Sequence, residues 1–223
     1  MNVYMTEEEQ VEVIKKWWNT YGSTLITFVM IFALSYAGLR WWQAREGKIN
    51  QQASIAYQQL LANEADKDTA GVTALANTIL SQHASSPYAD LALLIQARDA
   101  VAAKKYSDAE AFFDKLILQS KNNLVKQVAK IRAARLLLAE KKYQKALEMV
   151  NRVDNKNFQP LASEVRGDIF LAQGNKAKAR QAYVSAIQAM PNNAAVKPIL
   201  QMKLDDLPQS DRQVKEANAG AHA

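Results

Sequence analysis

The sequence contains no cysteine, and only two of its 223 residues are histidine. The absence of cysteine excludes both a disulfide framework and a thiolate metal site, and it leaves the redox compartment undetermined. His83 has no second potential ligand near it in the sequence, and His222 lies in the C-terminal tail. We therefore expect no metal site.

Motifs for catalysis and for cofactor binding are also missing. The seven glycines form no glycine-rich phosphate loop, and no convincing catalytic triad of serine, histidine and acid can be assembled. The one carboxylate pair spaced by a helical turn, Glu164 and Asp168, has no histidine, metal ligand or nucleophile beside it. The sequence predicts a protein that is not an enzyme and that uses no cofactor and no small-molecule substrate.

The charge pattern gives little support to nucleic-acid binding. The formal net charge is +6, but the basic residues are scattered and form no run interleaved with aromatic residues. Moderate positive charge suits an anionic membrane surface or an acidic partner, and it also suits an ordinary solvated surface. We therefore expect no nucleic-acid partner.

One apolar run stands out near the N-terminus. The segment from Trp17 to Leu39 holds 23 residues without a charge, and as a helix it would span about 35 Å. Indole rings prefer the interface between water and lipid, so Trp17 and Trp18 at one end and Trp41 and Trp42 at the other predict two interfacial belts. The alternative is a buried helix of a soluble core.

A cleaved signal peptide has a basic start, a shorter apolar stretch and a small-residue cleavage site. Here the leader begins with acidic residues, and the apolar run ends in Arg40, Trp41 and Trp42. The sequence thus predicts an uncleaved anchor. Positive charges are almost balanced on its two sides and barely favour placing the C-terminal side inside, so composition leaves the orientation open.

A repeat follows the anchor. Three aligned segments share the alanines Ala109, Ala146 and Ala179, which are spaced 37 and then 33 residues apart. This spacing is close to the 34-residue period of tetratricopeptide helix pairs, each of which buries its apolar face against its neighbours. The three segments are KKYSDAEAFF from Lys104, KKYQKALEMV from Lys141 and GNKAKARQAY from Gly174.

Small and large residues recur at the positions that such pairs require. A small residue, where two helices approach closely, stands twelve positions before each shared alanine, and a large residue stands four positions after it. The small residues are Ala97, Ala134 and Gly167, and the large residues are Phe113, Val150 and Tyr183. We expect an irregular first helix pair ahead of these repeats and a closing helix that contains Ile199, Met202, Leu204 and Leu207.

The expected fold class is all-α, with a single N-terminal transmembrane helix followed by a tetratricopeptide-like helical-repeat solenoid. The predicted parts are a leader over 1–20, a transmembrane anchor over 21–42, a repeat domain over 43–207 and a disordered tail over 208–223.

The concave face of such a stack is lined by the first helix of each pair. Counting from the shared alanines, we expect two arginines from successive repeats one above the other, followed by carboxylates, beside apolar residues. This face would bind an extended peptide or a helix of a partner, although it is equally compatible with ordinary solvated ion pairs. The predicted groove residues are Leu94, Arg98, Ile131, Arg135, Glu164 and Asp168.

Several segments together resemble the YfgM-like family. They occur in the family's order between residues 5 and 207, and the tail departs from the family pattern. The segments are EEEQVEVIKKWW, the anchor with Arg40, Trp41 and Trp42, ASIAYQQLL, SPYADLALL, VRGDIFLAQGNKAKARQAY and QMKLDDL.

The resemblance implies a single-pass inner-membrane protein that is an ancillary subunit of the SecYEG translocon. It implies a cytoplasmic leader, a periplasmic repeat domain and a partnership with the periplasmic chaperone PpiD, where translocated polypeptides emerge. It does not identify the contact residues. Two other functions remain open: a membrane-anchored regulator that sequesters a signalling or response protein, and a scaffold for envelope assembly.

Overall fold

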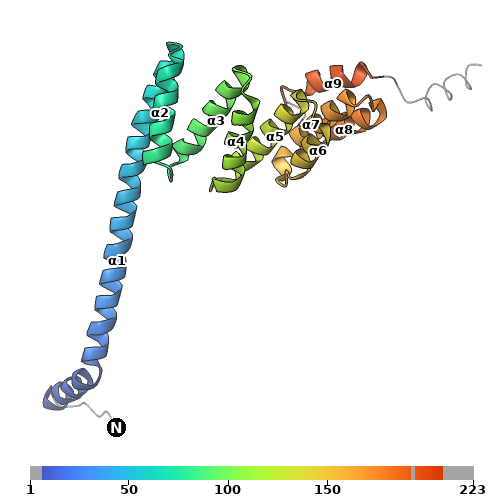
Figure 1. Cartoon of the computed structure of the whole chain (residues 1–223). Helices are drawn as coiled ribbons and strands as arrows, with labels where there is room; N and C mark the ends of the chain where they lie inside the picture. The colour runs from blue at the N-terminus through green and yellow to red at the C-terminus, as the bar shows by residue number, and fades with distance from the viewer. Residues whose placement is uncertain (1–6, 192–193, 208–223) are drawn as a thin grey trace, which may run out of the picture. The chain divides into compact units, whose positions relative to one another are not determined.

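The computed structural model describes residues 7–191 and 194–207, and within them it contains helices and no strand (Figure 1). The all-α class predicted from the sequence is confirmed. The nine α-helices of this part are α1 (Glu7–Ala65), α2 (Thr69–Gln82), α3 (Pro87–Ala102), α4 (Tyr106–Gln119), α5 (Asn123–Ala139), α6 (Tyr143–Asn151), α7 (Gln159–Ala172), α8 (Lys176–Ala189) and α9 (Lys197–Asp205).

The chain divides into two compact units, Met1–Ile55 and Ala56–Ala223. The first contains most of α1, which is long and apolar enough, by length and composition, to cross a membrane. Helix α1 runs without a break through both predicted edges of the anchor, so the boundaries over 1–20, 21–42 and 43–207 stay predictions. The predicted tail over 208–223 lies outside the described residues.

The second unit is a series of helix pairs. Helix α3 packs on α4, α5 on α6 and α7 on α8, while α4 also contacts α5 and α6 contacts α7. The shared alanines Ala109, Ala146 and Ala179 are fully buried, as the close approach of paired helices requires. Each pair thus completes its core with residues of the next pair.

The same turn joins the helices of four successive pairs. Lys67, Lys104, Lys141 and Gly174 all have positive φ, between 59° and 78°. In each turn the following residue donates its N–H to the carbonyl five positions earlier, as Lys105 does to Ala100 at 2.8 Å. These are Schellman motifs, which satisfy the last carbonyls of a helix. The turn between α1 and α2 therefore has the same geometry as the turns of the later repeats. Its sequence, NEADKD, does not resemble theirs.

The last helix closes the series. Leu200 and Leu204 of α9, together with Leu207, are buried against α8 in a cluster that includes Tyr183. Ile199 and Met202, which the sequence also assigned to a closing helix, are on α9 but are exposed. A closing helix is therefore present, but it ends at Asp205, before the predicted member Leu207, and only one of its faces belongs to the core.

Candidate protein-binding site

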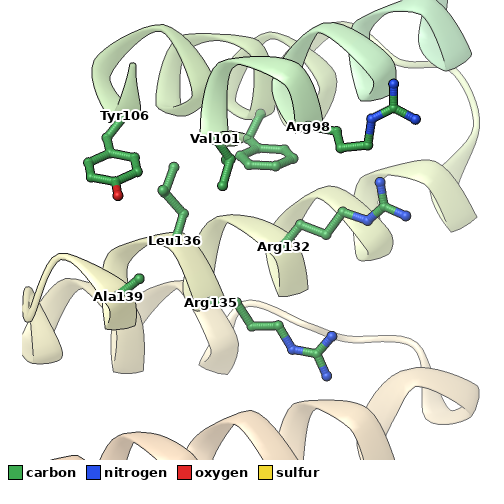
Figure 2. Close-up of a pocket in the computed structure, with 8 residues that line it drawn as sticks. Arg98, Val101, Tyr106, Arg132, Arg135, Leu136 and Ala139 are labelled. Carbon is green, nitrogen blue, oxygen red and sulfur yellow. The ribbon is translucent and has the colours of Figure 1, made fainter. Parts of the chain in front are cut away.

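A pocket of about 380 Å³ opens on the repeat unit where α3, α4 and α5 meet (Figure 2). Helix α3 contributes two of its lining residues, α4 two and α5 four. The lining residues are Arg98, Val101, Tyr106, Phe113, Arg132, Arg135, Leu136 and Ala139.

Helical spacing explains why these residues share one cavity. Arg98 and Val101 are three positions apart on α3, and the lining residues of α5 follow one another at intervals of three, one and three. Such spacings place side chains on the same helical face. Phe113 and Leu136 are buried members of the core cluster that also line the pocket, so they form its apolar floor. The labelled guanidinium groups extend beside Leu136.

The guanidinium group of Arg98 makes three hydrogen bonds to carboxylates of its own chain. Its Nη1 donates to Glu64 Oε1 at 2.6 Å, and its Nε and Nη2 donate to Asp99 Oδ1 at 2.9 Å and 2.8 Å. The hydrogen bonds that Arg98 donates to Asp99, followed by the one that it donates to Glu64, raise the pKa of Arg98 above its usual value. Arg98 lines the pocket, but its hydrogen-bonding capacity is largely used.

The other two arginines are less engaged. Arg135 reaches Glu164 Oε2 with a single contact of 3.4 Å, and half of its side chain is exposed. Arg132 is exposed and has no hydrogen-bond or ion-pair partner in the part of the chain that the structure describes. Arg132 was not among the groove residues predicted from the sequence, although its position three residues before Arg135 places it on the same face of α5.

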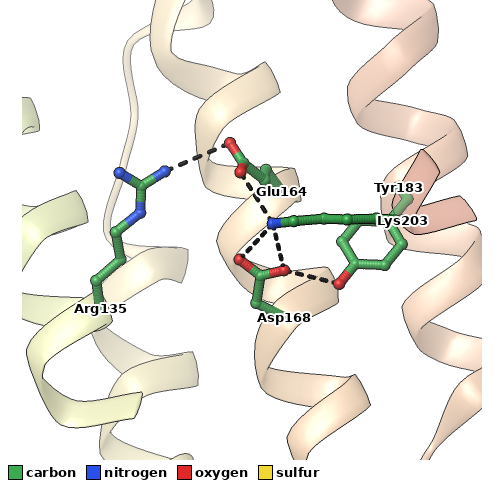
Figure 3. A network of polar contacts seen from close by, with 5 residues as sticks. All are labelled: Arg135, Glu164, Asp168, Tyr183 and Lys203. Carbon is green, nitrogen blue, oxygen red and sulfur yellow. Dashed lines mark hydrogen bonds and ion pairs between the residues drawn. The ribbon is translucent and has the colours of Figure 1, made fainter. Parts of the chain in front are cut away.

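The predicted carboxylates belong to a separate network (Figure 3). Lys203 Nζ of α9 lies 3.1 Å from Glu164 Oε1 and 2.8 Å from Asp168 Oδ1, and the hydroxyl of Tyr183 donates to Asp168 Oδ1 at 2.7 Å. Only 7% of Glu164 is exposed. These contacts bind α7, α8 and α9 together, so most of the capacity of both carboxylates is used internally.

Burial and charge shift two pKa values in this network. Burial, assisted by the hydrogen bond and negative charge of Asp168, raises the pKa of Tyr183 well above its usual range. Burial alone would lower the pKa of Lys203, but the hydrogen bonds and charges of Asp168 and Glu164 outweigh it and raise that pKa. At neutral pH, Tyr183 is therefore a neutral donor and Lys203 a cation.

The remaining predicted residues lie elsewhere. Ile131 is 4% exposed and packs in the core cluster of α5, α6 and α7. The expectation that it lies on an open groove surface is therefore wrong. Its position on α5 faces the neighbouring helices α6 and α7, whose apolar side chains cover it. Leu94 is partly buried against the core cluster of α3 to α5. The structure thus brings Arg98 and Arg135 of the predicted set into one pocket, and it adds Arg132.

The four tryptophans are all exposed on α1. Trp17 packs beside Tyr21, with ring centroids 5.9 Å apart, and the guanidinium of Arg45 lies 5.8 Å from the ring centroid of Trp41. Exposed indole rings at both ends of an apolar helix are typical of membrane interfaces. The interfacial role of Trp17, Trp18, Trp41 and Trp42 remains a prediction.

Comparison with known proteins gives matches along almost the whole chain. The family model described as a tetratricopeptide repeat-like domain matches residues 15–209. A protein of Neisseria gonorrhoeae named ancillary SecYEG translocon subunit is 28% identical over 208 residues, which cover 93% of this chain and 100% of that protein.

Proteins with the same name in other bacteria match over similar lengths. The one from Aggregatibacter actinomycetemcomitans is 30% identical over 203 residues, covering 90% of this chain and 97% of the relative. The one from Escherichia coli is 24% identical over 207 residues, covering 93% and 99%. No solved structure gives a significant match. On the strength of these full-length matches and the repeat architecture, the chain belongs to the family of ancillary SecYEG translocon subunits with a tetratricopeptide repeat-like domain.

Proposed function

We propose that this chain is a non-enzymatic adaptor of the SecYEG translocon. One observation carries the proposal: the similarity to relatives of that name extends over both the apolar helix and the repeat domain. This chain and its relatives thus have in common both the apolar helix and the repeat domain, in the same order. A repeat unit with an exposed pocket and no assembled catalytic group among its described residues suits a protein that binds other proteins.

The proposed placement is the inner membrane, with α1 as a single span, the N-terminus in the cytoplasm and the repeat unit in the periplasm. In this location the repeat unit would partner a PpiD-like periplasmic chaperone and help to receive or fold proteins that emerge from the channel. The pocket on α3, α4 and α5 is the proposed contact, because it combines an apolar floor with exposed guanidinium groups.

Orientation can be tested with single cysteines, because the natural chain has none. Ser107→Cys, exposed on α4, and Glu12→Cys, exposed near the start of α1, provide one reporter on each side of the apolar run. With a membrane-impermeant maleimide, we expect Ser107→Cys to react once the outer membrane is permeabilised. We expect Glu12→Cys to react only after the inner membrane is broken. The reverse order would support a cytoplasmic regulator.

Partners can be identified by crosslinking in intact cells. A photoreactive residue at Arg98, Arg135 or Ala139 samples the pocket, and one at Arg152, which is exposed outside it, serves as the control. We expect the pocket positions to capture a SecYEG subunit or a PpiD-like chaperone more strongly than the control. Capture of a cytoplasmic response protein, or equal capture from position 152, would contradict the proposal.

A further inference from the structure

The geometry points to a specific ligand for the pocket: a peptide segment of the partner protein that places an apolar side chain next to a carboxylate, with Arg132 pairing with that carboxylate. This inference rests on the proposed function, because it assumes a protein partner. It goes beyond that function because it specifies the side chains of the recognised segment and assigns the binding of its carboxylate to Arg132.

The three arginines of the pocket differ in how far their own chain already binds them. Arg98 is held by two carboxylates at 2.6 Å and 2.8 Å, so an incoming anion would have to displace an internal partner. Arg132 has no such partner among the described residues, so pairing with an external carboxylate breaks no contact of the folded chain. A charge-assisted, bidentate pair with a carboxylate is the strongest interaction that a guanidinium offers.

Arg135 is only weakly bound by its own chain. Its contact with Glu164 is 3.4 Å long, and Glu164 keeps Lys203 at 3.1 Å if Arg135 turns away. Arg135 can therefore assist Arg132 without leaving the buried Glu164 unpaired. Arg132 and Arg135, three positions apart on α5, then form a cationic, anion-binding subsite beside the pocket. Figure 2 shows both guanidinium groups extending to the same side.

The pocket also has an apolar floor. Val101, Phe113, Leu136 and Ala139 present aliphatic and aromatic carbon to the cavity, and Tyr106 completes its wall. A volume of about 380 Å³ falls at the lower end of the range of about 300 to 1,000 Å³ for small-ligand sites, which suits one large side chain. A free phosphate or a lipid headgroup would use the arginines but leave this floor uncovered. A peptide carrying both features covers both surfaces.

The test uses the full-length protein in detergent micelles and fluorescent peptides measured by anisotropy. The probe is Gly-Gly-Phe-Asp-Gly-Gly, with Gly-Gly-Phe-Asn-Gly-Gly and Gly-Gly-Ala-Asp-Gly-Gly as matched controls. The asparagine removes only the charge, and the alanine removes only the apolar side chain. We expect each control peptide to bind about tenfold more weakly than the probe, as the loss of one charge-assisted contact or of one buried ring would cause.

Substitutions assign the effect to Arg132. Arg132→Gln should bind the aspartate and asparagine peptides equally, while Arg132→Lys should retain part of the preference. Arg152→Gln, an exposed arginine outside the pocket, should leave the tenfold preference unchanged. Equal binding of both peptides by the natural chain, an unchanged preference in Arg132→Gln, or no binding of any peptide would overturn the inference.

These results are separable from the proposed function. If crosslinking captures the translocon or its chaperone but the peptides show no preference, only the ligand chemistry is wrong. If the peptides show the expected preference but crosslinking captures other proteins, the pocket is a peptide site of a protein with another role.

Discussion

Among single residues, Gly167 permits the close approach of α7 and α8 because it has no side chain. A Cβ atom at this position would overlap the ring of Tyr183, and that ring is fully buried. The ring is also held in place by the 2.7 Å hydrogen bond from its hydroxyl to Asp168. A side chain at position 167 therefore cannot be accommodated by a simple rotation of its neighbour.

The first prediction is that Gly167→Ala destabilises the repeat unit by about 1 to 3 kcal/mol, the usual cost of forcing extra volume into a packed core. The gain in helix propensity from alanine, about 1 kcal/mol, offsets part of the overlap. Urea unfolding followed by circular dichroism measures the change.

Gly47→Ala is the matched control, because nothing lies within 4 Å of a Cβ added there. We expect it to leave the unfolding midpoint of the repeat unit unchanged. A Gly167→Ala protein as stable as the natural chain would show that α7 and α8 can separate without cost.

At the scale of the element, α9 is attached through both apolar and ionic contacts. Leu200 and Leu204 are buried against α8, and Arg180 of α8 donates to the carbonyls of Leu204 and Leu207 at 3.3 Å and 3.4 Å, at the C-terminal end of the helix. Lys203 adds the ionic contact to α7. A nine-residue helix is too short to be stable alone, so these contacts determine that it forms.

The second prediction concerns Lys203→Met, which leaves the buried Glu164 with only the long contact to Arg135. We expect a loss of about 1 to 2 kcal/mol at pH 7, below the 3 to 5 kcal/mol of a fully buried pair because Lys203 and Asp168 are partly exposed. Thermal unfolding of both proteins across a pH series measures the loss.

The pH dependence of this loss follows from the raised pKa of Lys203. A lysine whose pKa is higher in the folded chain than its ordinary 10.5 stabilises the fold fully below 10.5 and loses that effect as the pH rises through its folded pKa. The difference between the two proteins should stay constant from neutral pH to about 10 and shrink only above 10.5. Lys121→Met, an exposed residue, should show no difference at any pH. A difference that shrinks below pH 9 would contradict this assignment.

In the whole molecule, the four clusters of buried apolar side chains among the described residues all lie in the second unit. Leu60, at the end of α1, is fully buried with Val72, Ala76 and Ile79 of α2. The ring of Tyr57 also packs on Tyr88 of α3 at 5.5 Å between centroids. The last turns of α1 thus belong to the repeat unit, while the preceding part of the helix has mostly exposed side chains.

The third prediction separates these two parts of α1. Removal of residues 1–55 should give a protein that is soluble without detergent, helical and cooperative in unfolding, because every cluster residue from Leu60 onward is kept. Removal of residues 1–65 also deletes Leu60 and the Glu64 partner of Arg98, and it should cost at least about 2 kcal/mol. Urea unfolding in the absence of detergent compares the two. Equal stability of both truncated proteins would show that the end of α1 is not part of the fold.

Part of the candidate site could be predicted from the sequence. The 37-residue and 33-residue spacing of the shared alanines indicated which helices pair, and this placed Arg98 and Arg135 on related positions of α3 and α5. Ile131 was misplaced because α5 is covered on more than one side, and the repeat pattern does not show how much of each helix its neighbours bury. Glu164 and Asp168 were assigned to a binding face because no local sequence pattern indicates that Lys203 pairs with them. Lys203 is 39 residues from Glu164 and 35 residues from Asp168.

Features that depend on the order of residue types could be predicted from the sequence. The uncharged run of α1 and the helix-pair period belong to these, because hydropathy and residue spacing along the chain define them without any contact between distant residues. Which polar groups already have hydrogen-bond partners could be learned from the folded structure alone. Arg98, Arg135 and Arg132 are the same residue type, but they differ in their partners. Arg98 is paired with Glu64 and Asp99, Arg135 has one long contact to Glu164, and Arg132 has no partner among the described residues. Hydrogen bonding between distant residues depends on where the folded chain places their atoms, so the availability of Arg132 is a property of the fold.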